Sequence, residues 1–129
     1  MHEIQIDEPV EFGGSGRGPN PAEVMLAALT ASVGVTCRAW AAFLEIPCDE
    51  ITLSVSGELD VRGFMDTDNA IRSGFANINV RLDITGPVST VQLDELKTLI
   101  SRSCPILDTV RNGSAVDLEV IQKDNNGTS

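Results

Sequence analysis

The sequence predicts a single α+β domain in which an antiparallel sheet packs on a long buried central helix and a second helix. Three observations predict this class: an uncharged stretch over residues 24–36, three segments of alternating apolar and polar residues, and helical spacing over residues 90–102. The 129 residues, 42% of them apolar, are enough for one hydrophobic core. We therefore expect one domain over 1–129, with a frayed tail over 123–129.

The strongest element is the helix predicted over residues 20–45. Asn20 is a suitable N-cap, and Glu23 stands three residues later, as in a capping box. The uncharged stretch is too short to span a membrane and is followed by Arg38, which favours a buried central helix. One face carries small residues that let another backbone approach closely: Ala27, Ala31 and Gly34.

Alternation predicts strands over residues 51–61, 78–84 and 116–120, because a half-buried antiparallel strand has apolar residues at every second position. Ile4 and Ile6 indicate a further strand near the start of the chain. A helix is expected over 90–102, with Leu93, Leu96 and Ile100 on one face, and a short helical turn is expected after Pro105.

The charge balance argues against nucleic acid as a partner. The chain has 9 Lys and Arg against 19 Asp and Glu, a formal net charge of −10, and no basic run. Its single histidine, His2, argues against a histidine metal site or a Ser-His-Asp triad, so we expect no metal and no cofactor. The first residues lack the pattern of a secretory signal, and we expect no membrane partner.

Three cysteines are candidates for chemistry, and their odd number favours reduced thiols in the cytoplasm. Cys104 precedes Pro105 at a predicted helix start, where amide groups and the helix dipole favour a thiolate. Cys37 lies on the apolar helix, where burial raises a thiol pKa and a structural role is the simpler interpretation. Cys48 begins a strand without an activating neighbour.

Other polar residues have weaker patterns. The segment 12–18, rich in glycine, lacks the ending of a phosphate loop, although Arg17 could hold an anion beside the helix start. Ser32, Thr36 and Trp40 follow one another at one-turn intervals on the central helix. A buried hydroxyl there usually bonds back to the carbonyl four residues earlier, and Ser32 has no histidine to act as its base.

Three blocks of the sequence resemble the OsmC/Ohr family of small thiol-dependent proteins. Residues 19–32 resemble the family's central-helix signature, residues 59–64 its strand-end pattern, and residues 103–112 its second cysteine motif. The resemblance implies an OsmC-like fold, an intertwined homodimer and sites at the subunit interface. It also implies peroxidase chemistry, in which a peroxidatic cysteine becomes a sulfenic acid, a resolving cysteine closes a disulfide, and a cellular dithiol reduces it.

Carried over to this sequence, the resemblance places Cys104 at the resolving position and Ser32 at the peroxidatic position. Ala22 stands where one branch has a glutamate, while the adjacent Glu23 matches the acidic residue of other members. The N-terminal hairpin with the family's arginine is shortened or absent, and Arg17 is a loose substitute. Cys37 is a poor replacement for Ser32, because it lies about 7.5 Å further along the helix and about 140° around it.

Two functions follow from this resemblance. The first is a peroxide-stress protein related to organic hydroperoxide reductases, with reduced or altered peroxidase activity, in which Cys104 and the Ser32 position form the catalytic site with Glu23 and, more weakly, Cys37. The alternative is a non-catalytic protein that binds a small apolar ligand in the dimer-interface pocket. In either case we expect Arg17, Thr36 and Trp40 to contact the ligand.

Overall fold

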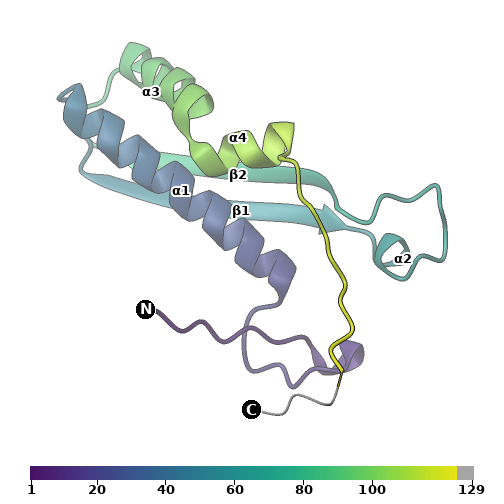
Figure 1. Cartoon of the computed structure of the whole chain (residues 1–129). Helices are drawn as coiled ribbons and strands as arrows, with labels where there is room; N and C mark the ends of the chain where they lie inside the picture. The colour runs from purple at the N-terminus through teal and green to yellow at the C-terminus, as the bar shows by residue number, and fades with distance from the viewer. Residues whose placement is uncertain (125–129) are drawn as a thin grey trace.

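The computed structural model describes residues 1–124 and has two layers (Figure 1). A long antiparallel hairpin forms one layer, and three helices cover one of its faces. The elements, after a 3₁₀ turn at Val10–Phe12, are α1 (Pro21–Phe43), β1 (Glu50–Leu59), α2 (Val61–Phe64), β2 (Phe75–Thr85), α3 (Thr90–Ser103) and α4 (Pro105–Asn112). The predicted α+β class is confirmed.

Helix α1 begins and ends through local hydrogen bonds. The Asn20 side chain accepts the Glu23 amide at 2.8 Å, and the Glu23 carboxylate accepts the Asn20 amide at 3.1 Å, which completes the predicted capping box. At the other end Glu45 adopts a left-handed conformation, and the Ile46 amide donates to the Ala41 carbonyl at 2.8 Å. This closure returns the chain toward the hairpin.

The hairpin has the face predicted from alternation. Ile51 lies opposite Ile84 and Leu53 opposite Leu82, and these side chains are half-buried beneath the helices. Gly34 of α1 lies over Leu53: a Cβ at this position would be 3.0 Å from a Leu53 methyl group. One member of the small-residue face is therefore used to bring α1 close to β1, whereas Ala27 and Ala31 are exposed.

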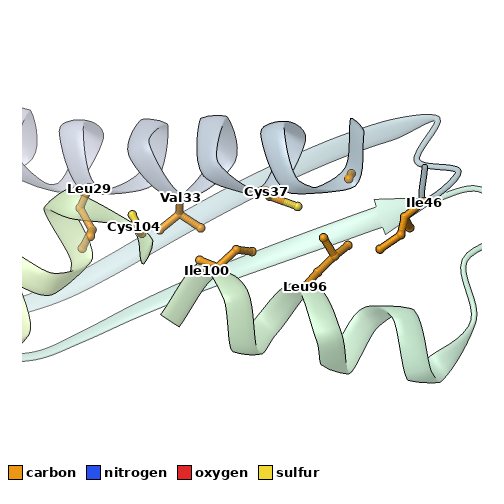
Figure 2. Packing of buried hydrophobic residues seen from close by; sticks show 8 residues of the cluster. Leu29, Val33, Cys37, Ile46, Leu96, Ile100 and Cys104 are labelled. Atoms are coloured by element: carbon orange, nitrogen blue, oxygen red, sulfur yellow. The ribbon is translucent and has the colours of Figure 1, made fainter. Parts of the chain in front are cut away.

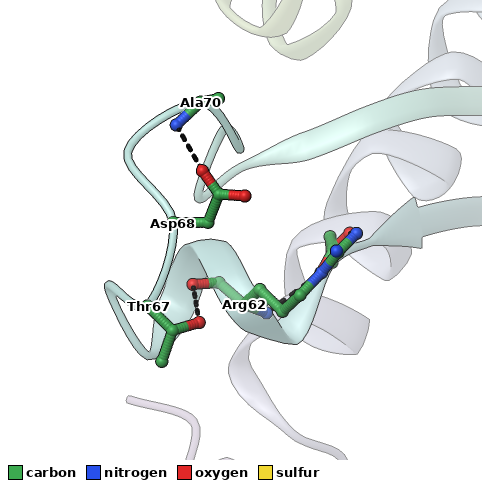
Figure 3. A network of polar contacts seen from close by, with 5 residues as sticks. Arg62, Thr67, Asp68 and Ala70 are labelled. Atoms are coloured by element: carbon green, nitrogen blue, oxygen red, sulfur yellow. Dashed lines mark hydrogen bonds and ion pairs between the residues drawn. The ribbon is translucent and has the colours of Figure 1, made fainter.

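The strand predicted to reach Val61 ends at Leu59 instead. Asp60 accepts the Arg62 amide at 3.0 Å and pairs with the Arg62 guanidinium at 2.7 Å, which starts α2 and turns the chain (Figure 3). Further bonds order this connection, from the Thr67 hydroxyl to the Arg62 carbonyl and from the Ala70 amide to Asp68. The strand-end motif is thus a helix cap that ends β1.

The core lies between α1 and α3, above the hairpin (Figure 2). Its buried members come from one face of α1, from the link after it, from α3 and from the α3–α4 junction: Leu29, Val33, Cys37, Ala41, Ile46, Leu96, Ile100 and Cys104. Burial of α1 is confined to this face, since Val35 and Phe43 are 71% and 77% exposed. By length and composition α1 could also cross a bilayer, a test that the core helix of a folded domain passes as well.

Two predicted strands do not form. Residues 116–120 are extended but unpaired, with Val116, Leu118 and Val120 exposed at 84, 86 and 90%, and Ile4 and Ile6 are likewise exposed and unpaired. A strand needs the amide and carbonyl groups of a neighbour, and no further strand of the described chain lies beside these segments. Lys123 and Asp124 carry no regular structure, and the remaining predicted frayed tail, 125–129, lies outside the described residues.

Candidate functional site

Ser32 and Cys104 meet where α1 crosses the junction of α3 and α4. The Ser32 Oγ lies 3.3 Å from the Cys104 Sγ, although the two residues are 72 positions apart in sequence. Either atom can be the donor when Cys104 is a thiol, and only the hydroxyl can donate when it is a thiolate. The structure thus brings together the two residues that the family resemblance assigned to the peroxidatic and resolving positions.

Cys104 caps both neighbouring helices with its backbone. It is the C-cap of α3, where its amide donates to the Ile100 carbonyl at 3.0 Å, and the N-cap of α4, which Pro105 begins. Its side chain makes no capping hydrogen bond to α4. The thiol therefore lies at the amino end of α4, as the sequence predicted, directed toward α1.

This environment lowers the pKa of the Cys104 thiol from its ordinary value. Burial is the largest influence and raises that pKa, but the Ser32 hydroxyl, which contacts the sulfur, together with the nearby Leu107 and Ile106 amides and the Thr36 hydroxyl, outweighs the burial. The Cys104 side chain is only 1% exposed, so the thiolate is favoured by local donors and not by water. Such a sulfur is suited to nucleophilic chemistry once a substrate reaches it.

Thr36 and Trp40 support this junction from α1. The Thr36 hydroxyl donates to the Ser32 carbonyl at 2.7 Å, as expected for a hydroxyl in a helix. The Trp40 indole donates to the Ser103 hydroxyl at 2.8 Å, and Ser103 in turn donates to the Leu99 carbonyl at 2.6 Å. Trp40 thereby holds the residue immediately before Cys104, a link that no local sequence pattern signals.

Cys37 lies in the core, with an exposed fraction of 0%. Burial, followed by the nearby Cys48, raises the pKa of the Cys37 thiol, and the neighbouring Arg38 only partly opposes this. The surroundings of Cys37 therefore favour the neutral thiol, whereas those of Cys104 favour the thiolate. All three cysteines are free.

Glu23 and Arg17 have local contacts at the entrance to α1. The Glu23 carboxylate is engaged by the Asn20 amide in the capping box. The Arg17 amide donates to Asp7, and the Arg17 side chain is exposed. Neither side chain has a hydrogen bond to Ser32 or Cys104 among the described residues.

Asp7 organises the glycine-rich segment and was missed by sequence reasoning. Its carboxylate accepts the amides of Glu8, Ser15 and Arg17 at 2.8 to 3.2 Å, and these bonds, led by that of Arg17, hold the Asp7 pKa below its usual range. Amides that could cradle an external anion are thus directed at the protein's own carboxylate. The feature of the sequence that could have indicated this role is an acidic residue shortly before a glycine-rich segment, whose backbone amides have no partners in a helix or strand.

A cavity of about 600 Å³ opens between β2 and the helices, next to the thiol site. Its walls are mainly apolar, with Asp94, Lys97 and Arg111 among the polar residues lining it. Leu107 links the two features, because it lines the cavity and its amide is one of the groups that lower the Cys104 pKa. The main apolar lining residues are Leu29, Val33, Val80, Leu96, Ile100 and Leu107.

The family model described as OsmC-like protein matches residues 14–119. An OsmC-like protein from Mycoplasma pneumoniae is 22% identical with a TM-score of 0.72, covering 84% of this chain and 72% of its own. An organic hydroperoxide resistance protein OsmC from Legionella pneumophila is 21% identical with a TM-score of 0.61, at 85% and 74% coverage. An OsmC-like hydroperoxide resistance protein from Jannaschia sp. CCS1 is 16% identical with a TM-score of 0.59, at 87% and 71% coverage.

Among curated proteins, none matches this sequence. The solved structures establish the likeness of fold, and the family model extends across α1, the hairpin and both C-terminal helices. The Ser32–Cys104 junction lies inside the matched region. This chain belongs to the family of OsmC-like proteins.

Proposed function

We propose that the chain is a hydroperoxide-reactive thiol protein of reduced peroxidase activity, in which Cys104 works without a second thiol at its site. The observation that carries the proposal is the 3.3 Å contact of the Ser32 hydroxyl with the Cys104 sulfur. A serine stands where two-cysteine chemistry needs a thiol. The names of the Legionella and Jannaschia proteins support hydroperoxide as the substrate class.

The proposed reaction begins with attack of the Cys104 thiolate on the terminal oxygen of the hydroperoxide. The O–O bond breaks, the sulfur is oxidised to a sulfenic acid, and the alkoxide takes a proton and leaves as an alcohol. An external thiol then attacks the sulfenic sulfur, water leaves, and a mixed disulfide forms. The second thiol of the reducing dithiol releases Cys104 in its reduced form.

Two features support a low rate. Ser32 cannot resolve the sulfenic acid, so each turnover waits for an external thiol. Cys104 is 1% exposed, so hydroperoxide and reductant must both reach a buried sulfur. The lowered pKa of Cys104, to which the Ser32 contact contributes, acts in the opposite direction and supports some retained reactivity.

Ser32→Cys is the variant that tests this proposal. We expect it to form a disulfide with Cys104 under mild hydroperoxide, seen as a linked product of the tryptic peptides Gly18–Arg38 and Ser103–Arg111, and to consume hydroperoxide faster than the wild type with a dithiol. Ser54→Cys is the matched control, because Ser54 is an exposed serine on β1. Rapid wild-type turnover that survives Cys104→Ser would overturn the proposal.

A second candidate function is binding of a small apolar molecule, and the cavity beside α3 favours it. Its volume is within the range of small-molecule sites, about 300–1,000 Å³. An environment-sensitive apolar fluorophore should bind the wild type and lose affinity in Leu96→Trp, which fills the cavity, but not in Thr98→Trp on the exposed face of α3. Binding without hydroperoxide turnover would favour this second function.

For the assembly we propose a homodimer. The proposal is supported by large apolar side chains that are mostly exposed on α1 and on the segment 114–121 and that a dimer could cover: Val35, Phe43, Val116, Leu118, Val120 and Ile121. The free state of the three cysteines supports a cytoplasmic location, and a net charge of −10 supports the expectation of no nucleic-acid partner.

A further inference from the structure

A pair of thiols, Cys37 and Cys48, lies apart from the Ser32–Cys104 site, on the C-terminal half of α1 and in the link that follows it. Cys37 is on the buried face of the helix, and Cys48 is half-buried in the link that leads to β1. Both belong to one apolar cluster, because Cys48 packs against the buried core that includes Cys37. Neither thiol has a role in the proposed chemistry of Cys104.

Two hydrogen bonds hold the link against α1. The Ile46 amide donates to the Ala41 carbonyl at 2.8 Å, which folds the chain back at the end of the helix. The Arg38 guanidinium then donates to the Cys48 carbonyl at 2.9 Å. Since Arg38 is the residue next to Cys37, this bond fixes Cys48 beside the helical turn that carries the buried thiol.

Electrostatics supports the same proximity. After burial, the nearby Cys48 is the main cause that raises the pKa of Cys37. Arg38 acts on the same thiol with the opposite sign, so one cation and two thiols form a small cluster.

We propose that Cys37 and Cys48 form a second redox site, which a hydroperoxide converts to an intramolecular disulfide. This proposal does not rest on the chemistry assigned to Cys104. It assigns the first oxidation step to Cys48, which is the more accessible thiol, and the closing step to Cys37.

The step balances with one hydroperoxide per disulfide. The Cys48 thiolate attacks the terminal oxygen, the O–O bond breaks, and an alcohol leaves as Cys48 becomes a sulfenic acid. The Cys37 sulfur then attacks the Cys48 sulfur, the S–O bond breaks, and the hydroxyl leaves as water with the Cys37 proton. Two thiols are oxidised and one hydroperoxide is reduced to alcohol and water.

Closure requires Cα atoms within about 7 Å, and the link is the part of the chain that can adjust. Residues 44–49 form no helix or strand, and Glu45 already has a positive φ of 55°. A buried Cys37 with a raised pKa attacks slowly, so we expect a stoichiometric oxidation and not rapid turnover.

The test is oxidation of the reduced full chain, as wild type and as Cys104→Ser, with an excess of cumene hydroperoxide, followed by alkylation and trypsin digestion without reductant. The three cysteines fall into three different tryptic peptides, Gly18–Arg38, Ala39–Arg62 and Ser103–Arg111. We expect a disulfide-linked product of the first two peptides in both chains, and in Cys104→Ser an intact mass lower by two hydrogens. A dithiol should restore both free peptides.

Three variants separate this site from the Cys104 site. Cys48→Ser should abolish the linked product, and because Cys48 is half-buried in a link this variant is expected to fold. Cys37→Ala should abolish it as well, with folding checked by circular dichroism, whereas Cys104→Ser should leave it unchanged. A link that involves Ser103–Arg111, a link between two chains, or no link in the wild type would overturn the proposal.

Discussion

Ser32 differs from its neighbours on α1 in the direction of its hydroxyl group. The hydroxyls of Thr30 and Thr36 each donate to the carbonyl four residues earlier, at 2.6 and 2.7 Å. The Ser32 hydroxyl instead contacts the Cys104 sulfur. A helical serine that is directed at a thiol is a polar partner for that thiol, and its removal should change the pKa of the thiol.

Ser32→Ala is expected to raise the pKa of Cys104, because it removes the hydroxyl that contacts the sulfur and that leads the groups lowering this pKa. Alkylation of Cys104 at neutral pH should slow severalfold, and the pH at half-maximal rate should move upward. Stopped alkylation followed by peptide mass spectrometry measures both. Thr30→Val is the matched control, since Thr30 bonds only to its own helix, and an unchanged profile in Ser32→Ala would contradict the assignment.

The same lowered pKa has a consequence for stability. A group with a folded pKa below its unfolded pKa binds more protons when unfolded, so its contribution grows as pH rises through the interval between the two values. The contribution is complete above the unfolded pKa and is lost as pH falls through the folded pKa. We expect wild-type stability, relative to Ser32→Ala, to increase with pH across that interval.

At the scale of single elements, the capping role of Glu23 at the N-terminus of α1 can be tested by substitution. Glu23 accepts the Asn20 amide, so Glu23→Ala should lower the free energy of unfolding by about 0.5–1 kcal/mol. Glu23→Gln keeps the acceptor and should recover most of the loss in denaturant titrations.

These two variants also test Glu23 as a catalytic group. If the Glu23 charge acts on Cys104, Glu23→Gln should change the pH profile of Cys104 alkylation even though stability is retained. The capping role predicts no such change. A shifted pH profile of Cys104 alkylation in Glu23→Gln, with normal stability, would support a catalytic role for Glu23.

Local sequence signals were sufficient for the regular elements that carry their own caps or alternation. Asn20 and Glu23 predicted the start of α1, and alternation predicted the inward face of β1 and β2. The short helix α2 was missed because Asp60 reads equally well as the outward residue of a strand. Segment 116–120 has the pattern of a strand, but pattern alone does not supply a pairing neighbour.

The candidate site was predictable only in part, for a similar reason. The position of Cys104 before Pro105 indicated a helix start, and the family resemblance singled out Ser32. Their contact, and the bond from Trp40 to Ser103, join segments more than 60 residues apart and depend on how α1 crosses the α3–α4 junction. Spacing within either segment contains no information about that crossing.

For the whole molecule, the proposed homodimer leads to a concentration-dependent stability. A two-stranded hairpin has marginal stability by itself, and association that buries open apolar surface adds to the stability of each chain. Sedimentation velocity at micromolar concentration should give a dimer, and the thermal midpoint should rise with protein concentration.

Val35→Asp tests the surface proposed to be buried. Val35 is 71% exposed on α1, so the charge should cost little in a single chain but should weaken association by at least tenfold if this face is covered. Thr98→Asp on the exposed side of α3 is the control. A stable, folded monomer for the wild type would contradict the dimer.

The Ser32–Cys104 contact has a consequence in terms of evolution. A disulfide places its sulfurs about 2.05 Å apart, so the 3.3 Å between Oγ and Sγ is within about 1.3 Å of bonding distance. Many serine codons differ from a cysteine codon by one nucleotide. From such a codon a single nucleotide change would place a dithiol at this junction, where the helix ends and the neighbouring cavity are already present.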